Sequence, residues 1–369
     1  MRILALGGTG TLSTSIVKLS KEKGYEVAVF NRGNHKNLSG VKLIKGDFTQ
    51  EQDLLMLRKE KFDVIIDFLS RTAHDINRVY SILGNSCSQY IFISSSCVYR
   101  RNFEDFPIKE TSPKPNTLWN YNVQKYESEQ ELVKLSQGFS STYTIVRPYI
   151  TYDKKRIPLG ITPSYDYHKT LIERFRHNKP WFIWDDGKAI TTVTYVEEFA
   201  IGVIGLFLNP KAINEDFHIV GDYKYSQTEL VEQIKQKLNS NSPVVYLSSD
   251  KICESLPEYS SMLIGDRILD AIFDNSKIKE AVPELTFRTD LNKGLDIIIA
   301  NWDSTESSKI DYSFEARIDK MLSKYCASCD FIDYGDTSSL KKITYMLFKH
   351  FNLRLAGKLY GVLKKYLNK

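Results

Sequence analysis

The chain has 369 residues, of which 42% are hydrophobic and 26% are charged, the composition of an ordinary globular protein. Because single hydrophobic cores seldom grow beyond roughly 250 to 300 residues, this length predicts two domains. The N-terminal apolar run ends after Leu6, and later runs such as "IGVIGLFL" fall short of the roughly 20 residues of a spanning helix. We therefore expect neither a signal peptide nor a membrane span, and a cytoplasmic location.

The positive charge is concentrated at the C-terminal end. Residues 341–369 hold eight Lys and Arg and no Asp or Glu, a formal +8, which leaves −3 for the remainder of the chain's net +5. A surface that attracts anions is therefore expected only in this tail.

The cysteines indicate reduced thiols and no metal site. Their number is odd and their positions are scattered, at Cys87, Cys97, Cys253, Cys326 and Cys329. Only "CASC" at 326–329 has the spacing of a metal-binding pair, and the sequence offers neither a second Cys pair nor a His pair to complete a zinc site.

The first elements predict a site for a pyrophosphate. "RILAL" at 2–6 reads as a buried strand, and "TLSTSIVKLSKEKGY" as a helix that ends near Gly24. A glycine turn between them lets the backbone approach a phosphate at the helix N-terminus. The residues predicted to contact a dinucleotide here are Gly7, Thr9, Gly10, Thr11 and Leu12.

One position departs from the dinucleotide fingerprint. The spacing is Gly7-x-x-Gly10-x-x-Ser13, with serine in place of the third glycine. That glycine serves helix-to-strand packing, so a small side chain is a tolerable substitute. A turn with only a structural role is the alternative.

The end of the second strand, "YEVAVFNRG" at 25–33, bears on the choice of cofactor. An acid there would bind a ribose 2′-hydroxyl, but the chain has Asn31 and Arg32. Arginine can bind a 2′-phosphate bidentately, which favours NADP over NAD, with NAD as the alternative. Arg32 capping a turn before Gly33 is the structural alternative.

Further strands alternate with helical patterns and predict an α/β fold, a Rossmann-type doubly wound parallel sheet. They are expected at 41–48, 62–70, 89–96 and 143–149. Ligands bind beyond the carboxyl ends of such strands. There, Asp47 and Phe48 are expected to flank the adenine, and Leu69, Ser70 and Ser94 to line the groove. Asp47 as a helix cap is the alternative.

The predicted chemistry rests on a tyrosine and a lysine. Tyr121 and Lys125 are four residues apart in "YNVQK" and share one helix face. An ammonium beside a phenol lowers the pKa of the phenol, which can then exchange a proton with a substrate hydroxyl or carbonyl. Ser95 can donate a hydrogen bond to the same oxygen, although Ser94 or Ser96 could take this role.

The ordered segments resemble the extended short-chain dehydrogenase/reductase family, in the epimerase/dehydratase group that includes UDP-glucose 4-epimerase. They are "GGTGTLS", "NRG", "GDF", "ISSSCVY", "YNVQK", "VRPYITYD", "DDGKAITTVTYVEEFA", "FHIVGDYKYSQTEL" and "FDNSKIK", within residues 1–302. The resemblance implies a tightly held NAD(P) and the roles given to Tyr121, Lys125 and Ser95. It also implies that Arg147 and Pro148 border the nicotinamide.

Two departures narrow the expected reaction. Ser96 and Cys97 follow the serine where hexose 4,6-dehydratases of this family carry acids, so a dehydratase is not expected. Thr191 and Thr192 stand where nucleotide-sugar epimerases usually have an arginine for the diphosphate. Candidates to compensate are Lys154, Lys155, Arg156, Arg174 and Arg176.

The resulting domain plan has three parts. Residues 1–150 form the NAD(P)-binding domain, and 151–302 a smaller α+β substrate domain that completes part of the sheet. Residues 303–369 form a basic, helical C-terminal extension. Ser96, Tyr149 and Tyr152 are the candidate substrate contacts.

The tail carries an apolar stripe opposed by lysines. Phe348, Phe351, Leu355, Leu359, Val362 and Tyr366 recur at intervals of mainly three and four residues. Such a helix either lies on an anionic membrane or packs on its own body or a second subunit. We expect a homodimer.

The predicted function is an NAD(P)-dependent epimerase or oxidoreductase acting on a sugar, most simply a nucleotide sugar. A keto-sugar reductase that consumes NADPH is one alternative. A nucleotide- or RNA-binding protein on the same fold is another, although no nucleic-acid partner is expected. No residue fixes the sugar, the nucleotide or the carbon that is oxidised.

Overall fold

A computed structural model describes residues 1–34, 38–305, 309–327, 329–334 and 339–367. The chain folds into two compact units, each built from three segments. Unit 1 contains Met1–Asp153, Thr191–Lys224 and Asp270–Thr289, and unit 2 contains Lys154–Ile190, Tyr225–Leu269 and Asp290–Lys369.

These units differ from the predicted domain plan. The chain crosses between them several times, because segments beyond residue 190 return to complete unit 1. The extension 303–369 is not separate, since it belongs to unit 2.

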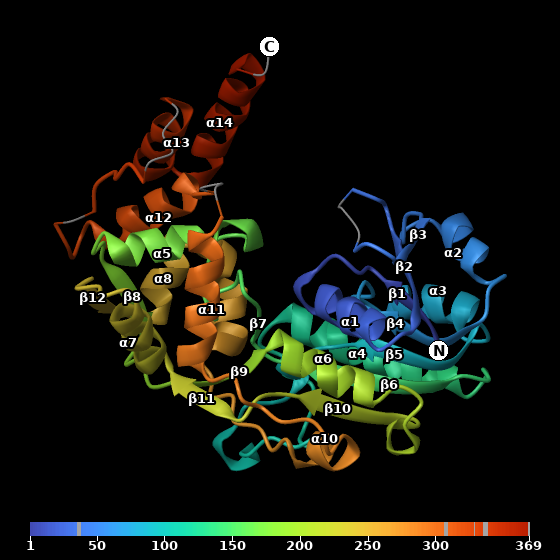
Figure 1. The fold of residues 1–369 in the computed structure, drawn as a ribbon. Helices are drawn as coiled ribbons and strands as arrows, with labels where there is room; N and C mark the ends of the chain where they lie inside the picture. Colours follow the sequence, from blue (N-terminus) through green and yellow to red (C-terminus); the bar gives the residue numbers. More distant parts are fainter. Residues whose placement is uncertain (35–37, 306–308, 328, 335–338, 368–369) are drawn as a thin grey trace. The chain divides into compact units, whose positions relative to one another are not determined.

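Unit 1 contains a seven-stranded parallel sheet with the strand order β10-β6-β5-β4-β1-β2-β3 (Figure 1). Its strands are β1 (Arg2–Leu6), β2 (Glu26–Asn31), β3 (Lys42–Lys45), β4 (Phe62–Asp67), β5 (Cys87–Ile93), β6 (Thr142–Pro148) and β10 (Glu215–Ile219). The order reverses between β1 and β4, which is where ligands bind in doubly wound sheets. The predicted Rossmann-type fold is confirmed.

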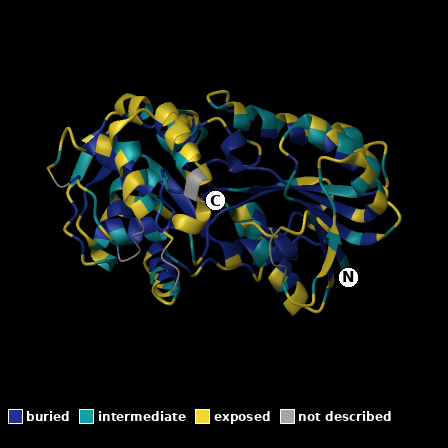
Figure 2. Ribbon diagram, turned by 90° about the horizontal axis from the view of Figure 1, so that it is seen from above, coloured by how far each residue is buried: buried dark blue, intermediate teal, exposed yellow. Residues whose placement is uncertain are grey.

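Helices cover both faces of this sheet, as right-handed crossovers require. They are α1 (Thr11–Glu22), α2 (Glu51–Leu57), α3 (Ala73–Leu83), α4 (Asn120–Ser136), α6 (Val196–Gly205) and α10 (Ser276–Ala281). Short 3-10 turns are η1 (Ser96–Val98), η2 (Phe103–Asp105) and η4 (Pro210–Ala212). In Figure 2 the central strands are dark blue, the colour of buried residues.

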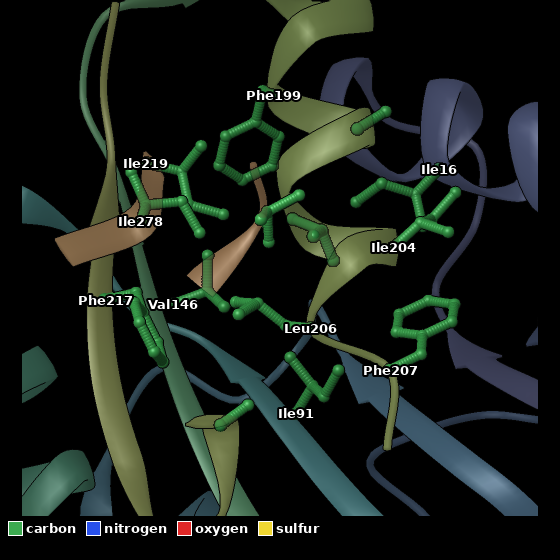
Figure 3. Packing of buried hydrophobic residues seen from close by; sticks show 14 of the residues in the cluster. Ile16, Ile91, Val146, Phe199, Ile204, Leu206, Phe207, Phe217, Ile219 and Ile278 are labelled. Carbon is green, nitrogen blue, oxygen red and sulfur yellow. The ribbon is translucent and has the colours of Figure 1, made fainter. Parts of the chain in front are cut away.

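Alternating side chains of the buried strands divide the core into two layers. In β1, Ile3 packs into the layer that includes Ile16 of α1 and Phe199 of α6 (Figure 3), whereas Leu4 packs into the opposite layer with Tyr80 of α3. Continuous apolar strands are typical of parallel sheets that are buried on both faces. This core fixes the strand ends from which the candidate site is built.

Unit 1 also contributes most of a three-stranded sheet with the order β11-β9-β7. Its strands are β7 (Thr151–Tyr152), β9 (Ile190–Tyr195) and β11 (Tyr223–Ser226). β7 and β9 pair in parallel.

Unit 2 combines helices with the parallel pair β8 (Trp181–Trp184) and β12 (Val244–Leu247). Its α-helices are α5 (Lys169–Arg176), α7 (Gln227–Lys237), α8 (Ser249–Ser255), α9 (Ser260–Met262), α11 (Leu291–Asp303), α12 (Tyr312–Leu322), α13 (Ser339–His350) and α14 (Leu353–Leu367). Other turns are η3 (Tyr165–Tyr167), η5 (Pro257–Tyr259) and a π-helical segment, Leu263–Arg267.

A buried ion cluster ties the C-terminal extension to unit 2. Arg174 of α5 donates to Glu315 of α12 at 2.8 Å and lies 2.9 Å from Asp319, while Lys179 pairs with both acids. All four side chains are buried. Separating α12 from α5 would break these pairs and leave buried charges uncompensated, which is energetically costly. The cluster therefore stabilises the packing of α12 against α5.

Two arginines of unit 2 are thereby engaged within the protein. Arg174 belongs to the buried ion cluster, and Arg176 pairs with Asp303 of α11 at 2.8 Å. Neither presents an unpaired guanidinium, which corrects the suggestion that they replace a diphosphate-binding arginine.

The predicted end of the first helix is confirmed, because Gly24, with a φ of +80°, follows α1. At the start of α7, Ser226 and Glu229 form a capping box. In the described part of the chain, no helix is both long and apolar enough to cross a bilayer. Nor does any group of three or more His, Cys, Asp or Glu among those residues form a candidate metal site.

Candidate active site

The glycine turn after β1 adopts a backbone that only glycine accommodates readily. Gly7 and Gly8 have φ values of +113° and +109°. A Cβ on Gly8 would lie 2.4 Å from Cγ1 of Val29, so a side chain there would displace β2. The turn brings bare backbone to the N-terminus of α1, where the first N–H groups have no partner within the helix.

Ser13 replaces the third fingerprint glycine at little cost. Its side chain is buried, and Oγ accepts a hydrogen bond from the Gly10 N–H at 2.9 Å. The serine side chain therefore pairs with the residue that caps the N-terminus of α1. The N–H groups of Thr11 and Leu12 in the first helical turn are not needed for this bond.

The loop after β2 holds the residues predicted to select the cofactor. Asn31 Oδ1 accepts a hydrogen bond from Gly33 N at 2.7 Å, which fixes the turn. Asn31 Nδ2 also donates to Gly7 O at 3.4 Å, joining this loop to the glycine turn. Arg32 is exposed, so its guanidinium is accessible to an anion.

Asp47 and Phe48 follow β3 in a tight turn. Asp47 Oδ1 accepts hydrogen bonds from the N–H and hydroxyl of Thr49, at 2.9 and 2.8 Å. These bonds, with smaller contributions from Arg32 and Arg78, lower the pKa of Asp47. The Arg78 guanidinium lies 5.0 Å from the centre of the Phe48 ring.

Asp67, which the sequence analysis missed, shapes the loop after β4. Its carboxylate accepts hydrogen bonds from the N–H groups of Leu69 and Ser70, at 2.8 and 2.9 Å, and from the Tyr90 hydroxyl at 2.7 Å. The only feature of the sequence that pointed to Asp67 was the presence of an acid at the end of an apolar strand. The hydroxyl of Ser70 is buried without a protein partner, the state expected of a group that a ligand completes.

The three serines after β5 are distinguished by their hydrogen bonds. Ser94 Oγ donates to Glu129 at 2.5 Å, and Ser96 Oγ donates to the Arg147 carbonyl at 3.0 Å. Ser95 Oγ instead accepts from Cys97 N at 3.2 Å. Two of the three hydroxyl protons are thus used inside the protein, which favours Ser95 as the donor to a substrate.

Lys125 is buried on α4 and anchored to the sheet. Its Nζ donates to the carbonyl oxygens of Ser70 and Ile93, at 2.8 and 3.0 Å, so the ends of β4 and β5 fix its position. Burial lowers its pKa from 10.5 to about 8. An ammonium held in this way retains one further N–H to offer a neighbouring oxygen.

Tyr121 lies one turn before Lys125 on the same helix and is half-buried. Its ring packs against that of Trp119, with a centroid distance of 4.7 Å. Trp119, the residue immediately before α4, was not predicted as part of the site. A lone tryptophan before a helix carries no motif that would have singled it out.

A buried clamp holds α4 against two strands. Glu129, one turn after Lys125, accepts from Arg147 of β6 through both carboxylate oxygens, at 2.8 and 2.7 Å, as well as from Ser94. Arg147 also donates to the Tyr99 hydroxyl at 2.7 Å and pairs with Asp216 of β10. Its guanidinium is engaged with these groups, and the expectation that Arg147 borders the nicotinamide stays a prediction.

The three predicted substrate contacts have partners within the protein. Ser96 and Tyr152 are fully buried, and Tyr152 packs on Tyr195 with a centroid distance of 5.4 Å. Tyr149 packs on Phe273 at 5.2 Å, below Arg101. These partners lie within unit 1, and the role of the three residues in binding a substrate stays a prediction. Pro148, at the end of β6, stays partly exposed.

A dinucleotide fits this set of residues on three independent observations. A side chain would obstruct the turn at Gly8, the Ser70 hydroxyl lacks a protein partner, and Lys125 converges on the ends of β4 and β5. All three features lie in unit 1. The arrangement can hold an anionic cofactor beside a tyrosine that exchanges protons.

The pKa of Lys125 predicts a pH dependence of cofactor binding. Because it is lowered to about 8, the ammonium is present below that pH and is lost as the pH rises through it. We expect the Kd for NADH to rise about fivefold between about pH 8 and about pH 9 in a fluorescence titration. Lys125→Met should bind more weakly with no such dependence, and a wild-type Kd that is flat over this range would contradict the prediction.

The sequence matches the NAD dependent epimerase/dehydratase family over residues 3–82 and 77–220. The chain belongs to this family, and it is an enzyme of the extended short-chain dehydrogenase/reductase type. The resemblance inferred from its motifs is thereby confirmed.

Two characterised relatives share moderate sequence similarity. A chloroplast stem-loop binding protein of Arabidopsis thaliana is 24% identical over 60% of this chain, and the match spans 59% of that protein's length. The 2′-dehydrokanamycin reductase of Streptomyces kanamyceticus is 20% identical over 77% of this chain and 79% of its own length.

Solved structures share the fold. UDP-glucuronic acid 4-epimerase from Bacillus cereus, in complex with UDP-glucuronic acid and NAD, superimposes with a TM-score of 0.65. The match covers 82% of this chain and all of that chain, at 19% identity. The Rossmann-type fold of this chain is therefore shared with that structure.

Proposed function

We propose that this enzyme oxidises a hydroxyl-bearing carbon of a sugar with NADP and returns the hydride to the opposite face, the net result being epimerisation. The observation that carries the proposal is the position of Tyr121 and Lys125, one turn apart on α4, with Lys125 anchored to Ser70 and Ile93. Tyr121, Lys125 and Ser95 are the proposed catalytic residues.

Each of the three residues has one task. The Tyr121 phenolate accepts the proton of the sugar hydroxyl, and the resulting phenol later returns it. Lys125 favours the phenolate by its positive charge, and Ser95 donates a hydrogen bond to the same sugar oxygen. The nicotinamide, when bound, supplies the hydride acceptor and donor.

The remaining predicted residues would hold the cofactor. The glycine turn with Thr9, Thr11 and Leu12 would hold the pyrophosphate, and Asp47 with Phe48 the adenine. The groove would be completed by Leu69, Ser70, Ser94 and Pro148. The hydrogen bonds and burial described for these positions in unit 1 support this assignment.

A nucleotide sugar is the proposed substrate class. The fold shared with an epimerase that binds UDP-glucuronic acid supports it. Thr191 and Thr192 in place of an arginine argue for a different diphosphate contact. Thr192 donates to the Ala271 carbonyl at 2.6 Å, whereas the buried Thr191 hydroxyl lacks a protein partner.

Arg32 is proposed to select NADP over NAD. A charge-assisted pair with the 2′-phosphate is worth roughly 1.5 to 3 kcal/mol, which at an exposed site predicts a preference of about tenfold. We expect Arg32→Ala to bring the NADPH and NADH Kd values within about twofold of each other. Lys42→Ala, on β3 and paired with Glu60, is the matched control. Equal wild-type Kd values for the two cofactors would contradict this selection.

A reductase is the second candidate, and the similarity to 2′-dehydrokanamycin reductase favours it. The two reactions differ in cofactor balance, because epimerisation recycles the nicotinamide and reduction consumes it. We propose to incubate the enzyme with UDP-hexoses and NADP, and separately with keto-sugars and NADPH. A new sugar epimer without net change in nicotinamide absorbance supports epimerisation, whereas stoichiometric loss of NADPH shows reduction. If neither change is observed, both epimerisation and reduction are contradicted.

RNA binding, suggested by the chloroplast relative, is disfavoured by the retained Tyr121 and Lys125 pair. A cytoplasmic location and a homodimer stay predictions, and light scattering of the purified chain tests the second.

A further inference from the structure

The helix α14 presents an uncovered apolar stripe. Leu355, Leu359 and Val362 are between 37% and 53% exposed, and their spacing of four and three places them on one face. The side chain of Ala356, by contrast, is buried. Figure 1 shows α13 and α14 side by side, and the rings of Phe348 and Tyr360 meet between them at 6.3 Å. One side of α14 is thus packed, and the apolar stripe is left to solvent.

Cations follow this stripe along α14. Arg354, Lys358 and Lys365 are exposed, and at 100° per residue they lie about a quarter turn from the stripe. Residues 339–367 contain seven Lys and Arg and no Asp or Glu. Apolar and cationic groups therefore adjoin on two helices that carry no acid of their own, although Asp330, outside them, pairs with Lys349.

The preceding helix repeats the pattern. On α13, Ile343 and Met346 are exposed, and Lys342 and His350 lie exposed on the same side. These four residues help to line a hollow of about 540 Å³. Exposed apolar side chains therefore lie beside exposed basic side chains on both α13 and α14.

A second cavity, of about 590 Å³, lies at the start of α14. Its lining includes the apolar Phe348, Phe351 and Leu353 and the cationic Arg354 and Lys324, together with two acids, Glu254 and Glu258. Glu258 pairs with Arg317, so part of the acidic charge is already neutralised. The cationic character of the surface continues around this end of the helix.

The charge decides between the partners that could cover this surface. A second copy of the same surface would bring Arg354, Lys358 and Lys365 against the same three cations, and like charges repel. Nucleic acid would match the charge but would leave the apolar stripe in water. An anionic bilayer satisfies both features, because phosphate groups pair with the cations while apolar side chains enter the acyl boundary.

We propose that α13 and α14 bind reversibly to the surface of a membrane that contains anionic phospholipid. α14 has 15 residues, short of the roughly 20 needed to span, so it lies in the interface plane. This inference is independent of the reaction catalysed in unit 1. It explains why an enzyme surface would keep this stripe exposed beside basic residues.

Flotation of the full-length protein with vesicles tests the proposal. The vesicles are phosphatidylcholine alone, or phosphatidylcholine with about 30% phosphatidylserine. We expect at least about tenfold more bound protein on the anionic vesicles, and loss of most of it when NaCl is raised from about 0.1 M to about 0.5 M. Equal binding to both vesicle types, or to neither, would overturn the proposal.

Two triple variants separate lipid from other partners. Leu355→Ser/Leu359→Ser/Val362→Ser and Arg354→Gln/Lys358→Gln/Lys365→Gln should each lower vesicle binding about tenfold. The matched control is Lys18→Gln/Lys134→Gln/Lys188→Gln, whose lysines are exposed elsewhere and which should bind as wild type.

Three outcomes of this comparison would overturn the proposal. One is unchanged vesicle binding by both α14 variants. Another is retention of a mixed-sequence RNA that needs the cations but not the apolar stripe, which would indicate nucleic acid. The third is a dimer that the serine variant converts to a monomer without any vesicle binding, which would indicate a second copy. Far-ultraviolet circular dichroism checks that the variants keep their helices.

Discussion

Tyr121→Phe is expected to lower kcat by about 10² to 10⁴, because it removes only the proton-transferring hydroxyl. The phenyl ring keeps its packing against Trp119, so the fold and the Kd for the dinucleotide should stay within about twofold of wild type. The readouts are turnover of the sugar nucleotide that the enzyme converts, and dinucleotide affinity by fluorescence titration.

Tyr126→Phe is the matched control for this change. Tyr126 lies on the same helix and is half-buried, but it is offset by five residues from Tyr121 and so faces a different direction. Its substitution should leave kcat within about twofold. Comparable losses in the two variants, or full activity in Tyr121→Phe, would show that the Tyr121 hydroxyl is not the proton carrier.

Arg147→Met is expected to destabilise the protein by about 3 to 5 kcal/mol, the largest effect on stability that we predict. The substitution removes both hydrogen bonds from the guanidinium to Glu129 and leaves that carboxylate buried with only Ser94 as partner. Asp216 also loses its partner, but it is partly exposed and Lys277 lies 3.5 Å away. The cost therefore falls mainly on Glu129.

The double variant Glu129→Met/Arg147→Met separates a lost contact from an uncompensated charge. It removes both members of the pair, so its urea midpoint should lie above that of Arg147→Met. Because Glu129 is one turn beyond Lys125, both variants should also lower kcat by loosening α4. An Arg147→Met protein as stable as wild type, or a double variant less stable than the single one, would contradict the role of the clamp.

The sequence was sufficient to predict the layers of unit 1. The apolar runs and glycine turn indicated β1 and α1, and helical patterns between further strands indicated a parallel sheet. These signals are local in the chain. They work because a strand that is buried on both faces must be apolar throughout.

The edge strand β10 and the units themselves depend on contacts between distant segments. Pairing of Glu215–Ile219 with β6 joins residues about 70 positions apart, and no periodicity within either strand specifies a partner. For the same reason the sequence did not predict that Arg174 holds the C-terminal extension through Glu315 and Asp319.

The candidate site was predictable where one residue type carries the chemistry. Tyr121, Lys125 and the glycine turn follow from spacing, and the hydrogen bonds of Ser94 and Ser96 support the choice of Ser95. Tyr149 and Tyr152 stay predictions as substrate contacts, because an aromatic side chain near a strand end serves packing as readily as binding. Asp67 and Glu129 were missed because their partners come from other strands.

Titration of the purified chain with NADH and NADPH shows whether the glycine turn and Lys125 belong to a dinucleotide site. We expect saturable binding of one dinucleotide per chain, with a lower Kd for NADPH than for NADH. Binding should be weakened by Lys125→Met and by Gly8→Val, whose side chain would meet Val29. Failure of wild type to bind either cofactor at about 1 mM, or binding that both substitutions leave unchanged, would contradict this expectation.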